Sequence, residues 1–588
     1  MTADNSIRSA LLTLRPTAWA LIATSVFLFL IYGYNRILPK PIPGIPYNKD
    51  IGIFGDLPAL LKAMNSGSIR PWLWAIPKRH NSAITQVFLS PFSKPFVILS
   101  DYYECYDIMV RRTEEFDRAS FHIDEFLPFM PDHRVAMMSS DPRLKANKEL
   151  VKGLMSPGIL SSDVVPVIYE KARHLMGLWK TKMDAAQGRP FAALEDLREL
   201  SWELTWTFTF GFDEGRGILE RHQEYLLSQG SSASWTDAAN TVCFARPPLP
   251  SEVYALAVMT KFMQFTTSSF APHLQVWILK RTKWRKYFQT KEKFLSDEIN
   301  KSVERLLAAG SDSSRRKTVL DHLLERELVM AEKSRSRPNF HKQSIRDEAF
   351  GSFVTGSDTV STAMGWAVKF LADNQTAQAK LRRQLHSSYR DAHGNKREPD
   401  VSEIVYTSAP YLDAFIEESL RCGKTVPSLV RQATVDTEIL GYHIPKGTTV
   451  FMGIGPSITE RAMPVAEQAR SPSSRAHSQR LPSWNDDEIA QFAPERWLKT
   501  SGDKTRTDAG EFDNVEYDCN AGPMLSFGAG SRGCFGKRLA HLEMRIMIAL
   551  LVWNFTFEKC APDLSSYVER DKVACVPAHC FVTLRRAE

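Results

Sequence analysis

The chain reads Phe527-Gly-Ala-Gly530-Ser-Arg532-Gly-Cys534-Phe-Gly536 close to its C-terminus and then runs directly into an apolar, helix-like segment. One cysteine therefore stands in a tight glycine-rich loop, with an arginine two residues before it. Glycine lets a backbone turn sharply and come close to a bound group. Amides in a turn or at the start of a helix stabilise negative charge on sulfur. The stretch is thus suited to presenting a single thiolate to the metal of a flat cofactor.

A cysteine thiolate at the axial position of haem iron donates electron density to the metal and favours O–O cleavage. The spacing Phe-x-x-Gly-x-Arg-x-Cys-x-Gly resembles the haem-binding loop of the cytochrome P-450 family, of microsomal type and as in fungal members. The resemblance implies haem b (iron protoporphyrin IX), with Cys534 as the metal ligand. It also implies that Phe527, Gly530, Arg532 and Gly536 contact the cofactor. The alternative is a structural, buried cysteine beside a glycine turn.

Length and composition permit a large core. The 588 residues are 43% hydrophobic and include 33 Phe and 13 Trp, enough to bury much apolar surface. The resemblance covers nearly the whole chain after its N-terminus and implies a mainly α fold with small β-sheets, as a single large domain. The net charge of +7 is small for this length. Because Lys and Arg form no dense run with interleaved aromatics, nucleic acid is not an expected partner.

The eight cysteines are scattered, without a C-x-x-C pair. This spacing argues against a zinc site and against a disulfide framework, and it suits a reducing compartment. Cys575, His579 and Cys580 lie close enough in sequence to suggest metal ligands. A buried strand near the C-terminus is the simpler interpretation.

The N-terminal region contains an uncharged apolar run at residues 18–34, with aromatic residues at both ends. About 17 residues is the short end of a membrane-spanning helix, and aromatic belts form at membrane interfaces. No small-residue cleavage site is evident, so a removed signal peptide is the weaker interpretation. Four prolines between residues 38 and 46 stiffen the following spacer. The predicted divisions are a tail at 1–17, a transmembrane anchor at 18–34, a proline-rich hinge at 35–49 and a catalytic domain at 50–588.

Microsomal members of the family also begin with an anchor and a proline hinge. The resemblance therefore implies a single-pass protein of the endoplasmic reticulum membrane with a cytosolic catalytic domain. It further implies contact with membrane lipid, and electrons supplied by NADPH-cytochrome P-450 reductase.

Behind the hinge, two short stretches rich in β-branched and aromatic residues predict strands at 84–89 and 95–100. Helical patterns then dominate from about 160 to 425. Two charged, polar stretches interrupt them and are predicted as exposed loops, at residues 309–317 and 332–338. A third stretch, 464–482, is rich in Ser, Arg, Ala and Gln, which predicts a disordered insertion. It departs from the compact loop that is usual in the family.

A second motif, Thr355-Gly356-Ser-Asp358-Thr359, lies in a long apolar helical pattern. Asp358 and Thr359 place a carboxyl group and a hydroxyl group side by side in this helix. Burying polar groups without hydrogen-bond partners is costly, so a function is expected for them. Proton delivery supplies one, since a hydroxyl can hold a water and an acid can relay protons to it. The motif resembles the family's oxygen-activating helix, so Thr359 and Asp358 are predicted to be catalytic and Gly356 to leave room for a ligand. Thr355 replaces the usual Ala or Gly and adds a polar group; the alternative is an Asp-Thr pair on a helix surface.

A third constellation is predicted to be structural. Glu418 and Arg421 stand three residues apart on one predicted helix face and can pair. The family has this Glu-x-x-Arg and a later arginine that completes a buried ion network, for which Arg496 is the match. Trp497 replaces the commoner Phe, and we expect it to be tolerated as another large aromatic side chain.

The partners of the haem propionates are predicted less directly. Arg532 can reach one carboxylate with a charge-assisted bond, and Arg431 belongs to the strand that usually borders the haem. The family commonly has Trp-x-x-x-Arg in an early helix, and this chain lacks the Trp there. Either Lys145 or Lys148 takes the place of that motif as a propionate partner, or both lysines are exposed to solvent and have no such role.

The substrate pocket is implied by resemblance alone. Its walls would come from residues 121–138, from the distal helix, and from residues 425–430 and 574–577. These are mostly aromatic or aliphatic, and the prominent side chains of the first wall are Phe126, Phe129, Met130, Met137 and Met138. They favour a small apolar organic substrate, although methionines also serve as core filler.

The motifs leave three alternative functions. The first is a membrane-anchored haem-thiolate monooxygenase that takes O2 and electrons and inserts one oxygen atom into its substrate, in secondary metabolism. The second is a haem-thiolate isomerase, dehydratase or peroxide-using enzyme, against which the intact Asp358-Thr359 pair argues. The third is a non-catalytic membrane-anchored binding protein, against which the complete cysteine loop argues.

Overall fold

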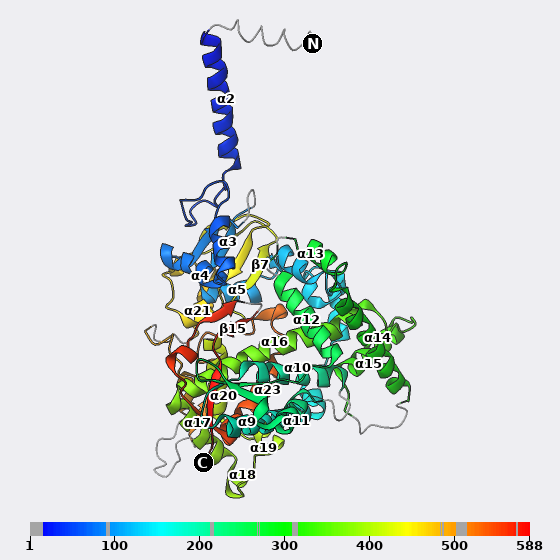
Figure 1. Cartoon of the computed structure of the whole chain (residues 1–588). Helices are drawn as coiled ribbons and strands as arrows, with labels where there is room; N and C mark the ends of the chain where they lie inside the picture. The colour runs from blue at the N-terminus through cyan, green and yellow to red at the C-terminus, as the bar shows by residue number, and fades with distance from the viewer. Residues whose placement is uncertain are drawn as a thin grey trace.

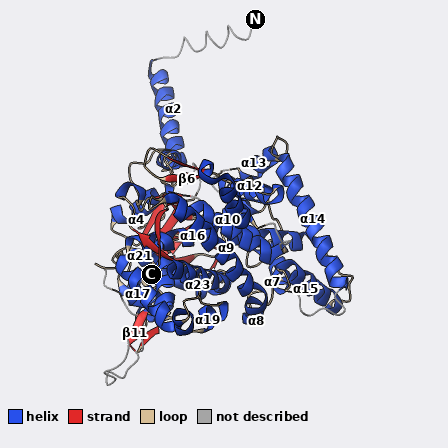
Figure 2. Ribbon diagram, turned by 60° about the horizontal axis from the view of Figure 1, so that its bottom comes forward, coloured by secondary structure: helices blue, strands red, loops and turns tan. Residues whose placement is uncertain are grey.

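The computed structural model describes residues 16–89, 94–211, 217–266, 269, 271–308, 316–481, 484, 487–500, 514–571 and 574–587. Helices dominate, and the strands form small sheets among them (Figures 1 and 2). This confirms the predicted mainly α fold with small sheets.

The first half of the described chain contains the following helices: α2 (Pro16–Ile37), α3 (Leu57–Asn65), α4 (Ile69–His80), α5 (Tyr102–Val110), α6 (Ser120–Phe126), η1 (Arg134–Ala136), α7 (Pro142–Leu150), α8 (Pro157–Ile159), α9 (Val165–Ala186), α10 (Leu194–Phe210), α11 (Ile218–Gln229), α12 (Ser251–Thr266) and α13 (Pro272–Leu279). The second half contains α14 (Arg285–Ala308), α15 (Val319–Lys333), α16 (Gln343–Asp373), α17 (Gln375–Ser388), α18 (Arg390–Gly394), α19 (Val401–Tyr406), α20 (Pro410–Gly423), α21 (Pro456–Thr459), η4 (Glu467–Ala469), α22 (Pro472–Ser478), η5 (Pro494–Trp497), η6 (Gly530–Arg532) and α23 (Lys537–Asn554).

The two strands predicted after the hinge are confirmed. They are β1 (Ile84–Val87) and β2 (Phe96–Leu99), which pair antiparallel with Ile84 opposite Leu99. The sheet is completed by β10 (Thr449–Met452), β7 (Leu429–Ala433) and β3 (Phe116–Asp117), in the order β1-β2-β10-β7-β3. A second sheet has the order β13-β16-β4-β6-β5, with strands β13 (Phe555–Glu558), β16 (Phe581–Arg586), β4 (Phe191–Ala192), β6 (Val242–Phe244) and β5 (Ser234–Thr236).

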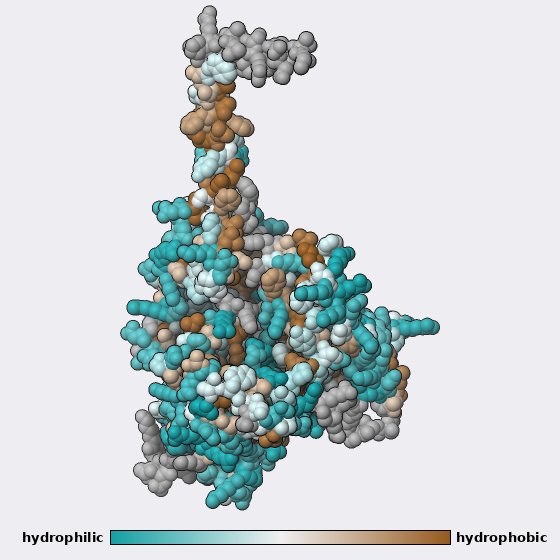
Figure 3. All heavy atoms as spheres, viewed as in Figure 1, coloured by the Kyte–Doolittle hydropathy of each residue, from teal (hydrophilic) through white to brown (hydrophobic). Residues whose placement is uncertain are grey.

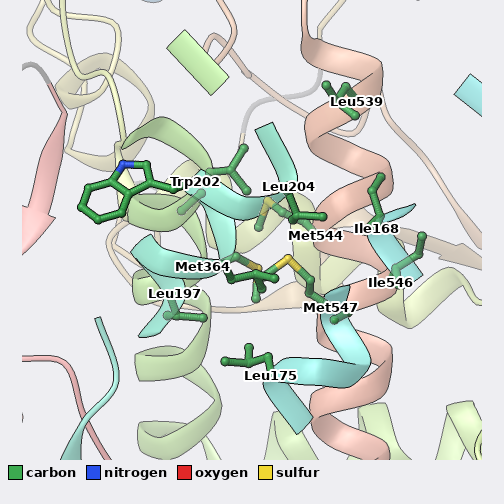
Figure 4. Close-up of a cluster of buried hydrophobic side chains, with 14 of the residues drawn as sticks. Ile168, Leu175, Leu197, Trp202, Leu204, Met364, Leu539, Met544, Ile546 and Met547 are labelled. Carbon is green, nitrogen blue, oxygen red and sulfur yellow. The ribbon is translucent and has the colours of Figure 1, made fainter. Parts of the chain in front are cut away.

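Four long helices, α9, α10, α16 and α23, bury their apolar faces against one another (Figure 4). Figure 4 labels Ile168, Leu175, Leu197, Trp202, Leu204, Met364, Leu539, Met544, Ile546 and Met547 in this core. Because α16 carries the Asp358-Thr359 pair and α23 begins three residues after Cys534, the packing of these helices positions both motifs.

Helix α2 projects from the rest of the protein and is covered with apolar side chains (Figures 1 and 3). Within it, Trp19–Ile37 is long and apolar enough to cross a membrane, and no residue of this segment is buried. Most of the predicted tail, residues 1–15, lies outside the described residues.

The predicted loop at residues 332–338 lies entirely within the described residues. Helix α15 ends at Lys333, and residues 334–338 form an exposed loop, as predicted. Residues 309–315 of the other predicted loop lie outside the described residues.

The predicted disorder of residues 464–482 is wrong. Residues 464–481 are ordered, contain η4 and α22, and pack on α5. Arg470 is buried, and its guanidinium donates to Asp101 Oδ2 at 2.7 Å. Ser471 adds two bonds, from its N–H to Glu104 Oε1 at 3.0 Å and from its hydroxyl to Asp107 Oδ2 at 2.8 Å. The polar composition is therefore satisfied by three buried acids far earlier in the chain: Asp101, the N-cap of α5, and Glu104 and Asp107 within α5.

Replacing Arg470 should release this segment. In Arg470→Ala, Asp101 keeps a buried charge without its cation, and breaking such a pair costs about 3–5 kcal/mol. We expect a lower melting temperature and faster proteolysis within residues 464–481. Arg475→Ala is the control, because Arg475 bonds carbonyl groups of its own segment. Equal proteolysis of the wild type and Arg470→Ala would contradict the docking role.

Candidate functional site

The cysteine loop is closed by backbone hydrogen bonds. The Cys534 N–H donates to Phe527 O at 2.8 Å, and the Gly533 N–H donates to Gly530 O at 3.0 Å. Gly530 has a φ of +69°, and a Cβ there would collide with the Met109 carbonyl of α5. This position therefore requires glycine both for its conformation and for close packing.

Cys534 lies immediately before α23, whose N-cap is Gly536. The Cys534 side chain is exposed, yet the surrounding protein limits solvation enough that burial raises the pKa of its thiol. The Gly536 N–H and the cations Arg134 and Lys537 act in the opposite direction on this pKa. These groups favour the thiolate, which is the form that binds metals.

Four arginines from separate parts of the chain interact beside this loop: Arg118, Arg134, Arg431 and Arg532. Burial, followed by repulsion from Arg532 and Arg431, lowers the pKa of Arg118 to about 9. Burial and repulsion from Arg532 lower the pKa of Arg431 to about 10. Asp117 offsets part of this charge, but it already accepts the N–H groups of Arg118 and Ser139. The cluster thus carries excess positive charge.

Within the described part of the chain, two guanidinium nitrogens of the cluster are buried without a hydrogen-bond partner or an ion-pair partner: Arg118 Nε and Arg532 Nε. Buried donors normally have partners. An anion with several acceptor oxygens would satisfy these donors and offset the repulsion. The two carboxylates of haem, next to a cysteine ligand, fit this donor set.

The structure brings the predicted Arg532 and Arg431 together and adds Arg118 and Arg134, which sequence reasoning missed. Arg134 directly precedes the apolar run Val135-Ala-Met-Met138, and a cation beside that run was the available signal. Lys145 and Lys148 of α7 are exposed, which favours the interpretation that they are solvated.

Arg134 links the cysteine loop to α16. Its guanidinium lies 4.0 Å from the ring centroid of Phe535, the residue after Cys534. Its NH1 also lies 3.5 Å from Glu348 Oε2 on α16, and its backbone N–H donates to Glu348 Oε1 at 3.1 Å. The segment around η1 therefore joins the two predicted motifs.

On α16, the hydroxyl groups of Thr355 and Thr359 donate to carbonyl groups one turn earlier, at Gly351 and Thr355, each at 2.8 Å. The Thr355 side chain is exposed and the Thr359 side chain is half-buried. The extra hydroxyl at Thr355 thus bonds within its own helix. Such back-bonding is the usual arrangement of a helical Thr.

Gly356 has a different role from the predicted one. A Cβ at Gly356 would lie 3.2 Å from Thr205 Cγ2 of α10. In addition, the Ser201 hydroxyl of α10 donates to Ser357 O at 2.7 Å. Gly356 therefore permits α10 to approach α16. Asp358 accepts a hydrogen bond from the Gln264 amide of α12.

The third constellation forms a buried network. The Arg421 NH2 donates to Glu418 Oε1 at 2.7 Å, and both side chains are fully buried. The Arg496 Nε reaches the same oxygen at 3.0 Å. The Trp497 indole N–H donates to Glu418 Oε2 at 2.9 Å, a bond that the commoner Phe cannot make. Trp497 is thus a polar member of the network as well as a large aromatic residue.

The predicted pocket side chains divide into two groups. Phe129, Met130 and Met137 are at most 3% exposed and belong to the buried protein interior. Phe126 and Met138 are half-buried. Cys575 and Cys580 are buried, and the eight cysteines, all of which lie within the described residues, form no disulfide.

The cytochrome P-450 family model matches residues 78–458 and 487–577. The interruption contains the segment 464–481 that packs on α5. A cytochrome P-450 monooxygenase, TRI13 of Fusarium sporotrichioides, is 32% identical over 579 residues, which cover 95% of this chain and 98% of that relative. A second, GME11363 of Pestalotiopsis microspora, is 31% identical over 586 residues, covering 96% and 97%.

Among solved structures, the crystal structure of the cytochrome P450DA haem domain superposes with a TM-score of 0.64. It is 14% identical and covers 94% of this chain and 99% of its own. This likeness shows a shared fold. Together with two relatives that match over nearly their full lengths, it means that the chain belongs to the cytochrome P-450 family and is a haem enzyme that incorporates oxygen from O2 into an organic substrate.

Proposed function

We propose that the protein is a membrane-anchored haem-thiolate monooxygenase of fungal secondary metabolism, with haem b held by Cys534 and electrons supplied by NADPH-cytochrome P-450 reductase. The overall reaction is R–H + O2 + NADPH + H⁺ → R–OH + H2O + NADP⁺. The half-buried apolar side chains Phe126 and Met138 favour an apolar substrate. The fungal relatives support secondary metabolism.

One observation carries this proposal: an accessible cysteine in a closed glycine loop lies beside a cluster of arginines in which the buried Nε atoms of Arg118 and Arg532 have no hydrogen-bond partner. Arg118, Arg134, Arg431 and Arg532 would hold the propionates, and Cys534 would hold the iron. The test is the carbon-monoxide difference spectrum of the reduced protein, followed by ¹⁸O2 labelling of product in the presence of reductase. A spectrum without thiolate character, or a product without the label, would contradict the proposal.

When bound, haem supplies the activation of O2 and the cleavage of its O–O bond. The protein must deliver protons for O–O cleavage and exclude bulk water from the site. Thr359, one turn beyond Thr355, would position a water through its hydroxyl, and Asp358 would relay a proton to that water. General acid–base assistance of this kind contributes typically 10²–10⁴-fold to rates.

Thr359→Ala should therefore uncouple NADPH consumption from product formation. We expect haem content and substrate binding to be retained, while product formed per NADPH consumed falls by about tenfold or more and hydrogen peroxide is released instead. Thr355→Ala is the matched comparison, because both threonine hydroxyls bond a carbonyl one turn earlier, so a loss of coupling confined to Thr359→Ala assigns the role to Thr359. An unchanged ratio in Thr359→Ala would refute the role of Thr359. Turnover without any reductase would instead favour the peroxide-using or isomerising alternative.

Two features support membrane attachment. Helix α2 is apolar and exposed along its length. Helix α13 lies on the side from which α2 projects (Figures 1 and 2), and its Trp277 and Ile278 are 53% and 46% exposed. Exposed Lys280 and Arg281 follow directly. Apolar side chains flanked by cations are typical of a segment that lies in a membrane interface.

A chain shortened to begin at Lys40 should retain haem and its spectrum, because α2 contributes no residue to the site described above. It should still bind vesicles containing anionic lipid in part, through α13. Adding Trp277→Ser to the shortened chain should weaken that residual binding. A folded shortened protein that cannot bind haem would show that α2 has a role in the catalytic region.

Exposed cations near the cysteine loop support docking of an acidic redox partner. Lys145 and Lys148 project from α7, and Lys537 and Arg538 form the first turn of α23. The Arg538 guanidinium donates to Met155 O at 3.3 Å, which ties the start of α23 to the segment that follows α7. A surface of one charge attracts a partner of the opposite charge and accelerates association.

A further inference from the structure

A hydrogen bond joins two helices that are far apart in sequence and that both bear on the proposed proton relay. The Gln264 side-chain amide, in the last turn of α12, donates to Asp358 Oδ2 on α16. Both side chains are half-buried. Asp358 directly precedes Thr359, so the bond fixes one of the two groups assigned to proton delivery.

Helix α12 belongs to a different layer from α16. It packs mainly on α14, where the Phe262 ring stacks on Phe288 with centroids 6.2 Å apart. Next to Gln264, Phe265 is 67% exposed, and α13 follows with the apolar surface described above. The position of α12 is therefore set mainly by its packing on α14, whereas α16 packs mainly on α10.

The donor is a neutral amide. A lysine or arginine at this position would form an ion pair with Asp358 and stabilise its charged form, whereas an amide orients the carboxylate without adding charge. A hydrogen bond to a charged acceptor is among the stronger ones in proteins. Gln264 can thus fix the orientation of Asp358 while leaving it able to exchange a proton.

We propose that Gln264 is a positioning residue for proton delivery: by holding the Asp358 carboxylate, it ties the geometry of the relay to the position of α12 over α16. This rests on the proposed function of Asp358. A shift of α12 away from α16 would break the bond and remove this constraint on the carboxylate. Proton delivery would then depend on the placement of a helix that carries no part of the cysteine loop.

The test needs no knowledge of the natural substrate. The full-length holoenzyme with reductase and NADPH releases hydrogen peroxide by NADPH + H⁺ + O2 → NADP⁺ + H2O2, and the rate is measured in H2O and in D2O. Gln264→Met keeps the size of the side chain and removes the donor, and Gln264→Glu places a second carboxylate against Asp358. Lys261→Met, at an exposed position on α12, is the matched control.

We expect Gln264→Met and Gln264→Glu to change the peroxide rate by roughly three- to tenfold and to alter its solvent isotope effect, with haem content and the carbon-monoxide spectrum unchanged. Lys261→Met should match the wild type. In an Asp358→Asn background, Gln264→Met should add nothing, because Gln264 acts through Asp358.

Three outcomes would overturn the inference. If Asp358→Asn changes the isotope effect and neither Gln264 variant does, Gln264 has no positioning role and the proposed function stands. Full additivity of Gln264→Met with Asp358→Asn would mean that Gln264 acts elsewhere. If Asp358→Asn itself has no effect, the proposed relay fails, and the inference fails with it. Gln264→Glu decides the question should Gln264→Met fold poorly.

Discussion

Cys534→Ser is expected to abolish turnover and to yield protein that is poor in haem or lacks the thiolate-type spectrum of the reduced carbon-monoxide complex. A serine hydroxyl is not a thiolate and does not donate comparable electron density to iron. The loop itself should survive, because its closing bond uses the Cys534 backbone N–H and the Phe527 carbonyl. The effect should therefore be on the cofactor rather than on folding, and far-ultraviolet circular dichroism separates the two.

The matched control is Cys519→Ser, which changes another exposed cysteine of the C-terminal region. It should retain both haem and activity. Wild-type spectrum and turnover in Cys534→Ser would remove the proposed ligand and leave the arginine cluster without its assigned role. Loss of haem in Cys519→Ser as well would indicate general thiol sensitivity instead.

Arg421→Ala should have the second largest effect, on stability. It leaves the fully buried Glu418 without the cation 2.7 Å away, and breaking a buried pair costs about 3–5 kcal/mol. Arg421 also donates to the carbonyls of Ile458 and Ile489, at 2.8 and 2.6 Å, so these acceptors would lose their donor. We expect a sharp fall in the yield of soluble holoprotein and in the melting temperature.

Graded controls make this prediction specific. Trp497→Phe removes the indole N–H bond to Glu418 and part of a buried ring, and should cost about 2 kcal/mol. Lys152→Ala breaks an exposed pair of the same spacing, Lys152 with Glu149 at 3.4 Å, and should cost at most about 1 kcal/mol. If Arg421→Ala is stable, fully loaded with haem and yet inactive, then Arg421 has a chemical role and the structural interpretation is wrong.

Patterns within a few residues were enough for several features. The strands β1 and β2 follow from β-branched and aromatic runs bounded by turn residues. The cysteine loop follows from glycines whose left-handed backbone conformation is a local requirement. Glu418 and Arg421 share a helix face because they are three residues apart. Each depends on chain neighbours, which the sequence displays directly.

Other features depend on segments that meet only in the folded protein. Composition predicted disorder at 464–482, because the three acids that order residues 464–481 lie far earlier in the chain. Gly356 suggested space for a ligand, but packing gave that space to Thr205 of α10. The hydrogen bond from Trp497 to Glu418 likewise needed the fold to show it.

The sequence by itself determined the family, and it predicted Cys534 as the haem ligand and the acid–alcohol pair of α16 as the proton relay, since each is written in a short motif. The tertiary structure alone decided which arginines gather beside Cys534 and which residue of α12 holds Asp358. The physical reason is that a motif needs only local backbone geometry. A charge cluster or a bond between helices is fixed by the packing of the whole core, which brings together side chains that no short-range pattern connects.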